Sequence, residues 1–354
     1  MTAYLFSGGR LLDPRAPELR EGMPLTLLTT KAVAAARRML MRGFTTVRDA
    51  GGSDWGLKTA TDDGIVEGPS VFIAGMPISQ TGGHGDFRRR TQTGFECACS
   101  SGLAYMSRIA DGVPDMLKAV RNELRKGADQ IKLMVSGGVA SQTRSARKLA
   151  VPGRRDRGGG RAGGELGHVR NGARVLGASD RTRGRLRRAH DRERQPDRRT
   201  GRAAHGIARR VHRADARDVR QPATSRSRLR AHGVQLQKNR IVLEAGLRSL
   251  ELCRAAGVQI GFGTDLLGAL QDDQCKEFQI RAQAMKPHEV IRSATLVNAE
   301  IVQRAGELGE LVPGALADLL VVDGDPYRDL GVLQDQGARI AGIMKGGRWF
   351  KNAL

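Results

Sequence analysis

His84 and Arg88 are the first residues along the chain whose types and setting could bind a substrate. His84 lies in the loop Ser79–Asp86, which is too rich in glycine to belong to a packed core. We expect His84 to contact a substrate and Arg88 to clamp a carboxylate, since a guanidinium binds a carboxylate through two parallel hydrogen bonds. The alternative is a solvated loop histidine with no part in binding.

Lys132 lies within a short apolar run that is typical of a buried strand, and Asp265 follows another such run, Val258–Gly263. Burial of Lys132 within Ile131–Met134 would favour its neutral amine over the ammonium ion. The alternative is a lysine on an edge strand whose charged end reaches water. Asp265 follows Gly-Thr at the end of its strand, a place where aspartate also commonly caps the next helix.

The cysteines predict neither a disulfide framework nor a closed zinc finger. There are four of them in 354 residues and no CxxC pair. Two lie together as Cys97-Ala-Cys99, but no histidine or further cysteine is near them. We therefore expect them to be loop or core residues rather than metal ligands.

The elements that must position these residues alternate between helices and short apolar strands. Expected helices are Thr29–Met41, a segment from Asp111 to Gly127, Ile241–Ala256 and Pro287–Ala299, and expected strands include Phe44–Val47, Val71–Ala74, Gln130–Val135 and Val258–Gly263. This alternation predicts a parallel sheet and favours a (β/α) barrel. The last part differs, because Ala317–Val322, Ile340–Ile343 and Arg348–Lys351 are predicted as strands of a small β domain.

Five stretches, in this order, resemble the metal-dependent amidohydrolase superfamily, in its imidazolonepropionase and Xaa-Pro/Xaa-Arg dipeptidase-like branch. They are Gly43–Asp49, Ser79–Asp86, Gln130–Gly138, Gly261–Asp265 and Gly309–Pro326. The resemblance covers most of residues 1–149 and 233–354. It implies a (β/α)8 TIM-like barrel and a small β-sandwich domain built from both termini.

The resemblance also implies a binuclear divalent metal site, with zinc the expected metal. In the family the ligands are a His-x-His, a carboxylated lysine, two later histidines and an aspartate. The lysine corresponds to Lys132 and the aspartate to Asp265. The implied reaction is hydrolysis of a C–N bond, with Asp265 as the catalytic proton shuttle and with the pKa of metal-bound water lowered to about 7.

The chain departs from the family near its beginning. Leu12–Gly22 resembles the opening of the small β domain, whereas Met23–Leu28 already resembles the helical region after the first barrel strand. A piece of family sequence is therefore expected to be missing between them. No His-x-His occurs anywhere in the chain, so we expect the barrel to be incomplete and the metal site to be doubtful.

A second departure is the composition of Val151–Arg230, which resembles nothing in the family. This segment holds 24 arginines, no lysine and 8 acidic residues, so it carries +16 of the formal net charge of +22. It has no aromatic residue, methionine or cysteine, and one isoleucine, Ile207. Such a composition cannot supply a buried apolar face, so we expect residues 151–232 to be disordered.

The genetic code suggests a cause for this composition. With suitable third bases, a shift of one nucleotide turns Asn171–Leu176 into Met-Ala-His-Ala-Tyr, and Val211–Pro222 into an apolar strand-like sequence. The hypothesis is therefore two compensating frame changes, either natural or introduced by sequencing. The segment's histidines fit no ligand spacing and do not predict a replacement metal site; they are His168, His190, His205 and His212.

These observations predict a small β domain from residues 1–22 and 309–354 and a barrel from residues 23–308. The function expected is metal-dependent hydrolysis of dipeptides or N-acyl amino acids, with this chain inactive or impaired. The alternative function is non-specific nucleic-acid binding through the arginines, although no aromatic residues are interleaved for base stacking. Neither a signal peptide nor an apolar run of about 18 residues is present, which predicts a cytoplasmic protein. The partner expected is a small-molecule substrate, without a specific nucleic acid or a membrane, and a homo-oligomer is compatible with the sequence.

Overall fold

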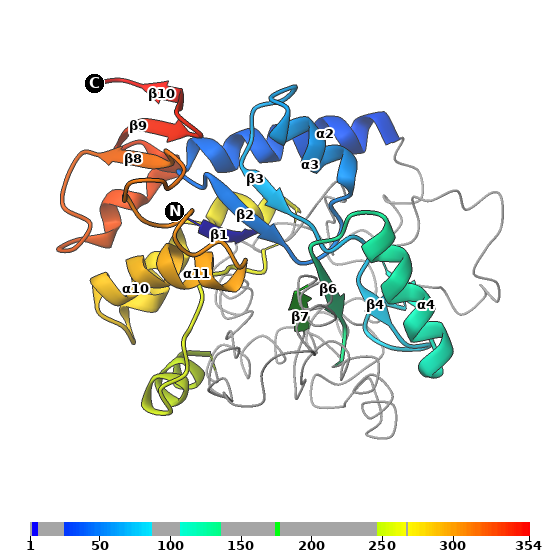
Figure 1. Ribbon diagram of the computed structural model, residues 1–354. Helices are drawn as coiled ribbons and strands as arrows, with labels where there is room; N and C mark the ends of the chain where they lie inside the picture. Colours follow the sequence, from blue (N-terminus) through cyan, green and yellow to red (C-terminus); the bar gives the residue numbers. More distant parts are fainter. Residues whose placement is uncertain (1, 6–24, 87–106, 136–173, 178–245, 267) are drawn as a thin grey trace, which may run out of the picture.

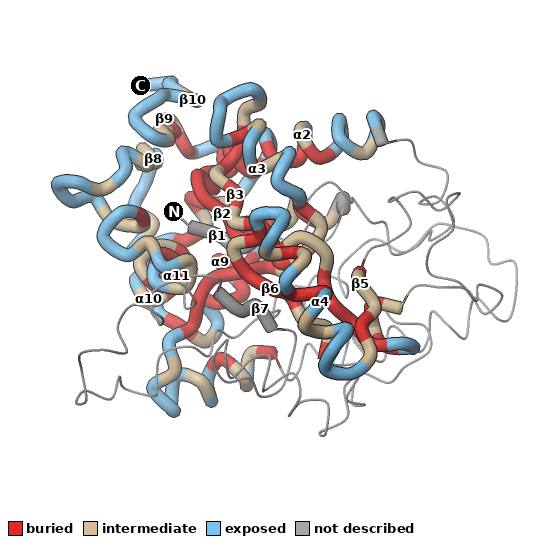
Figure 2. The backbone as a smooth tube through the Cα atoms, turned by 45° about the vertical axis from the view of Figure 1, so that its right-hand side comes forward, coloured by how far each residue is buried: buried red, intermediate tan, exposed pale blue. Residues whose placement is uncertain are grey.

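The computed structural model describes residues 2–5, 25–86, 107–135, 174–177, 246–266 and 268–354 (Figure 1). The buried residues concentrate along β2, β3 and β6 (Figure 2). Helices cover these strands and bury apolar residues against them. In the described part of the chain, no helix is long and apolar enough to cross a membrane.

Three parallel strands form the first sheet, in the order β1, β2, β3. They are Thr2–Leu5, Thr46–Asp49 and Ser70–Phe72. Helix α2 (Leu25–Met41) leads into β2, and α3 (Trp55–Asp62) lies between β2 and β3. Met39, Phe44 and Val47 are buried together in the largest apolar cluster, so α2 packs against this sheet.

The second sheet has the order β5, β4, β6, β7. Its strands are Ile78–Ser79 (β4), Arg108–Ile109 (β5), Gln130–Leu133 (β6) and Arg174–Gly177 (β7). Both β5 and β6 run parallel to β4, and α4 (Gly112–Arg125) buries its apolar side against β4 and β6. Parallel strands that alternate with helices confirm the α/β class.

Two strands of these sheets lie in segments for which the sequence led to another expectation. Thr2–Leu5 pairs with β2 of the first sheet, and the assignment of residues 1–22 to the small β domain stays a prediction. Arg174–Gly177 forms a strand antiparallel to β6, although it lies in the segment expected to be disordered. Its central Val175 and Leu176 are the kind of apolar pair that a strand accepts. Residues 6–22 and the remainder of 151–232 lie outside the described residues.

The C-terminal half contributes helices to the same core. Residues 246–255 are helical, and α9 (Lys276–Ala282), α10 (Pro287–Ala294) and α11 (Leu296–Ile301) follow. Leu250, Phe278 and Val290 from these helices join the cluster that contains Val47.

The three predicted C-terminal strands are confirmed as an antiparallel sheet in the order β10, β9, β8. They are Leu319–Val322, Ile340–Lys345 and Arg348–Asn352. Ile340 and Ile343 pack against Leu40 of α2, which attaches the sheet to the rest of the molecule (Figure 1). The domain boundary at residue 309 stays a prediction.

Candidate functional site

Lys132 lies on β6 with its residue 6% exposed. Successive side chains of a strand point to opposite faces. The neighbouring Ile131 packs with Ala119 and Val120 of α4. Lys132 therefore lies on the face of β6 opposite α4, and the sequence prediction of a buried lysine is confirmed.

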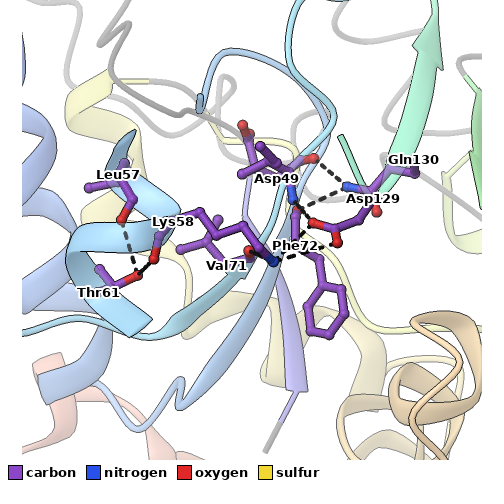
Figure 3. Close-up of polar contacts among 9 residues, drawn as sticks. Asp49, Leu57, Lys58, Thr61, Val71, Phe72, Asp129 and Gln130 are labelled. Carbon is purple, nitrogen blue, oxygen red and sulfur yellow. Dashed lines mark hydrogen bonds and ion pairs between the residues drawn. The ribbon is translucent and has the colours of Figure 1, made fainter. Parts of the chain in front are cut away.

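The start of β6 is fixed by two polar residues that the sequence reasoning did not single out (Figure 3). Gln130 Nε2 donates to the backbone oxygens of Asp49 and Phe72, each at 2.9 Å, and so joins β6 to the ends of β2 and β3. The carboxylate of Asp129 accepts from the backbone N–H of Ile73 at 2.7 Å and pairs with Lys58 Nζ at 3.2 Å. A polar pair at the start of an apolar strand was the available sequence signal.

His84 is half-buried in a loop that hydrogen bonds hold closely. The backbone N–H of Gly85 donates to Ser79 Oγ at 3.1 Å, and that of Gly82 donates to Asp86 Oδ2 at 2.6 Å. At the start of the loop, the hydroxyl of Thr81 donates to Asp111 at 2.5 Å. Hydrogen bonds therefore fix the backbone of the loop that carries His84. The contact of His84 with a substrate stays a prediction.

The His84 loop lies against the strand that carries Lys132. β4 and β6 are parallel, so both strands end at the same edge of the sheet. The N–H of Met134 donates to the backbone oxygen of Ile78 at 2.8 Å, and a Cβ added to Gly85 would lie 2.9 Å from Met134 Sδ. Two of the predicted site segments are therefore brought together.

Asp265 follows the predicted strand Val258–Gly263 by two residues. The structure forms no ladder there among the described residues beyond a single bridge residue, Gly263, so this strand prediction is wrong in detail. The backbone of Phe262 instead pairs with Asn298 of α11. Asp265 itself is half-buried, and its φ of 52° is left-handed. A left-handed aspartate costs free energy and is enriched at functional sites.

A buried ion pair of α9 packs against Phe262 in the segment before Asp265. Arg281 Nε donates to Glu277 Oε1 at 2.6 Å, and both side chains are fully buried. The guanidinium also stacks on the ring of Phe262, with its Cζ 5.0 Å from the ring centroid. Loss of hydration raises the pKa of Glu277 to about 7, and the charge of Arg281 opposes that rise. The spacing of four residues within one helix was the sequence signal for this pair.

The other predicted residues lie outside the described residues. These include Arg88, Cys97, Cys99 and the four histidines of the arginine-rich segment. In the described ranges, no group of three or more His, Cys, Asp and Glu side chains is close enough together to hold a metal ion. Lys132 and Asp265 alone do not fit a binuclear centre.

Comparison with known proteins points in one direction. A family model described as "Amidohydrolase family" matches residues 201–349. That match begins inside Val151–Arg230, which corrects the expectation that no part of this segment resembles the family.

Solved structures and a curated relative agree with the family model. A crystal structure of an amidohydrolase is 35% identical, with a TM-score of 0.75, and the likeness covers 99% of this chain and 86% of that one. A prolidase complexed with N-methylphosphonate-L-proline is 34% identical, with a TM-score of 0.75 and the same shares of both chains. Ochratoxinase from Aspergillus niger is 27% identical over 339 residues, which cover 88% of this chain and 66% of that protein. The chain thus spans slightly less than two thirds of the length of this curated relative.

Proposed function

The chain belongs to the amidohydrolase family, and from this premise we propose that it is built as a metal-dependent hydrolase of C–N bonds. Its fold is the TIM-barrel-like α/β fold of its structural neighbours. The observation that carries the proposal is the placement of buried Lys132 on β6, with the His84 loop against the end of the same strand. The family relationship, rather than a measured contact, groups Asp265 with them.

The proposed substrates are dipeptides and N-acyl amino acids. The related prolidase is complexed with a phosphonate derivative of L-proline, a compound that retains an amino-acid carboxylate. His84 would contact such a substrate, and Arg88 would bind its carboxylate in the fork geometry of a guanidinium. Asp265 would hold and transfer the proton that the leaving nitrogen needs.

A divalent metal, with zinc expected first, would supply an activated water when bound. By the family relationship, Lys132 as a carbamate and Asp265 correspond to two of its ligands, which do not complete a metal centre by themselves. The sequence lacks a His-x-His, and the described residues contain no complete ligand cluster. We therefore propose that this chain is inactive or impaired, through a lost N-terminal segment and a frame-shifted middle.

The experiment compares the chain as it stands with a repaired chain that carries a His-x-His segment and the shifted frame over residues 151–200, which precede the matched residues 201–349. Zinc content and hydrolysis of an Xaa-Pro dipeptide panel are measured for both. We expect substoichiometric zinc and negligible turnover in the first, and bound zinc with turnover in the second. Asp265→Asn in the repaired chain is the control, and it should abolish turnover.

Two results would count against the proposal. Stoichiometric zinc and Asp265-dependent turnover in the unrepaired chain would refute its impairment. No hydrolysis of any C–N substrate by a folded, zinc-loaded repaired chain would refute the hydrolase assignment. The cytoplasmic location, the homo-oligomer and the alternative of non-specific nucleic-acid binding remain predictions.

A further inference from the structure

The backbone of Phe262 is bound on both of its polar groups by one side chain. Its N–H donates to Asn298 Oδ1 at 3.0 Å, and its carbonyl accepts from Asn298 Nδ2 at 3.0 Å. The N–H is shared with the backbone carbonyl of Ser293 at 3.1 Å. A primary amide presents a donor and an acceptor side by side, as the peptide group of an adjacent strand would. Asn298 thus takes the place of a strand neighbour.

This pairing lies where water cannot replace it. Both Asn298 and Phe262 are 0% exposed. The ring of Phe262 is held as well, by Phe278 at a centroid distance of 4.4 Å and by the stacked guanidinium of Arg281. Loss of the amide would leave a buried carbonyl without its donor, which is costlier than the loss of an exposed hydrogen bond. Phe262 is therefore a firm anchor point of the chain.

The strained residue Asp265 follows this anchor by three positions. Its left-handed φ of 52° is a conformation that aspartate adopts more readily than most residues, but still at a cost relative to glycine. Thr264 and Leu266 on either side of it are 2% and 1% exposed. Buried residues therefore flank Asp265 on both sides. The first of the anchored residues along the chain is Phe262, whose backbone is held by Asn298.

We propose that Asn298 is a positioning residue for Asp265, which it holds in the left-handed conformation through the backbone of Phe262. This proposal rests on the catalytic role proposed for Asp265. Asn298 itself acts through the chain, without contact with substrate being required.

The first test measures hydrogen exchange in the full chain by mass spectrometry. Asn298→Leu keeps the size of the side chain and removes both bonds. We expect exchange of peptides over residues 258–266 to accelerate by about tenfold, the factor given by one buried hydrogen bond. Peptides over β9 should be unchanged. Ser293→Ala is the matched control, because it removes a buried hydroxyl bond of 2.6 Å to Val290 in the preceding helix and leaves the amide intact.

The second test separates positioning from a purely structural role. Asp265→Gly and Asp265→Ala both remove the carboxylate, but only glycine adopts a positive φ without strain. With Asn298 present, the glycine variant should therefore have the higher urea midpoint. In the Asn298→Leu background the strain can relax, so this difference should shrink or vanish.

The outcomes are separable from those of the hydrolase proposal. Unchanged exchange over residues 258–266, or a glycine–alanine difference that is equal in both backgrounds, would overturn the positioning role. Neither readout depends on turnover, so failure of the repaired chain to hydrolyse substrate would overturn the proposed function alone. If Asn298→Leu does not fold, Asn298→Ala carries the same exchange measurement, since it removes both hydrogen bonds without adding a branched side chain or a buried charge.

Discussion

Glu277 is a buried carboxylate, and one of its two oxygens is hydrogen-bonded. Oε1 accepts from Arg281, whereas Oε2 is buried without a hydrogen-bond partner in the described structure, as are both Nη atoms of Arg281. Loss of hydration therefore dominates, and it raises the pKa of Glu277 to about 7. The native state holds a proton there at pH values at which the unfolded chain has lost it.

Stability should consequently fall as pH rises from the ordinary glutamate pKa to about 7, and this group should add no further change above that. The loss is on the order of a few kcal/mol at most. Urea unfolding between about pH 5 and pH 7.5 measures it. Glu277→Gln cannot titrate and should lack this part of the slope. Equal slopes for both proteins would show that Glu277 does not control it.

At the scale of elements, periodicity and turn residues predicted most helices and the C-terminal sheet. The helix expected at Thr29–Met41 is found as α2, and the strand expected at Ile340–Ile343 lies within β9. The apolar residues of Val258–Gly263 have the spacing of a buried strand, which is why a strand is predicted there. In the structure, however, the side-chain amide of Asn298 hydrogen-bonds the backbone N–H and carbonyl of Phe262, which a neighbouring strand would otherwise bind. Apolar spacing contains no information about such a long-range pairing.

In the candidate site, too, some features could be predicted from the sequence and others could not. Lys132 could be predicted to be buried because its neighbours in β6 are apolar. The hydrogen bonds from Gln130 to Asp49 and Phe72 could not be predicted, because they depend on how two sheets meet (Figure 3). Left-handed Asp265 could not be predicted either, since its conformation is imposed by tertiary contacts.

The His84 loop offers a prediction at this scale. A Cβ on Gly85 would lie 2.8 Å from Ser79 Cβ and 2.9 Å from both Met134 Sδ and Ser107 Oγ. Gly85→Ala should therefore destabilise the protein by about 1–3 kcal/mol, as overpacking does, and displace the loop. Thermal or urea unfolding measures the cost, and exchange of residues 80–86 measures the displacement.

Gly127→Ala is the control for that variant. Gly127 has a φ of 89° and open space around it, so alanine there should cost about 1 kcal/mol through the backbone alone. It should leave exchange in the His84 loop unchanged. A Gly85→Ala protein as stable as the parent, with an unmoved loop, would contradict the close packing described here.

At the scale of the whole molecule, Arg42 joins distant parts of the chain. It leaves the end of α2 with its guanidinium buried, and Nη1 donates to Asp272 at 3.0 Å and to Gln336 at 2.7 Å. Nη2 donates to Gln274 at 3.0 Å. Burial lowers the pKa of Arg42, and the hydrogen bond with Asp272 opposes that change. The side chain of Arg42 thus connects the end of α2 with the segment that holds Asp272 and Gln274 and with the segment that holds Gln336.

Arg42→Met should therefore cost about 2–3 kcal/mol of unfolding free energy, because several hydrogen bonds to a buried charge are lost together. Arg38→Met is the matched control. Arg38 pairs with the same Asp272 at 3.2 Å but is half exposed, so its removal should cost less than about 1 kcal/mol. Equal costs for the two variants in urea unfolding would contradict the connecting role of Arg42.

The distribution of charge over the whole chain bears on the alternative of nucleic-acid binding. Val151–Arg230 carries +16 of the formal net charge of +22, all of its basic residues are arginine, and it has no aromatic residue. Such a segment attracts phosphates without reading bases, and each neutralised phosphate releases a counterion. If the segment arose by a frame change, duplex DNA should bind without sequence preference.

The affinity should then fall by about 10³-fold or more between about 50 and 200 mM salt, as expected when many phosphates are contacted. A gel-shift titration with two unrelated duplexes measures both properties. The chain with the shifted frame over residues 151–200 is the control, and it should bind either duplex more weakly because it lacks most of these arginines. A complex that prefers one duplex and persists at high salt would instead support a nucleic-acid-binding function, since contacts to base edges do not depend on counterion release.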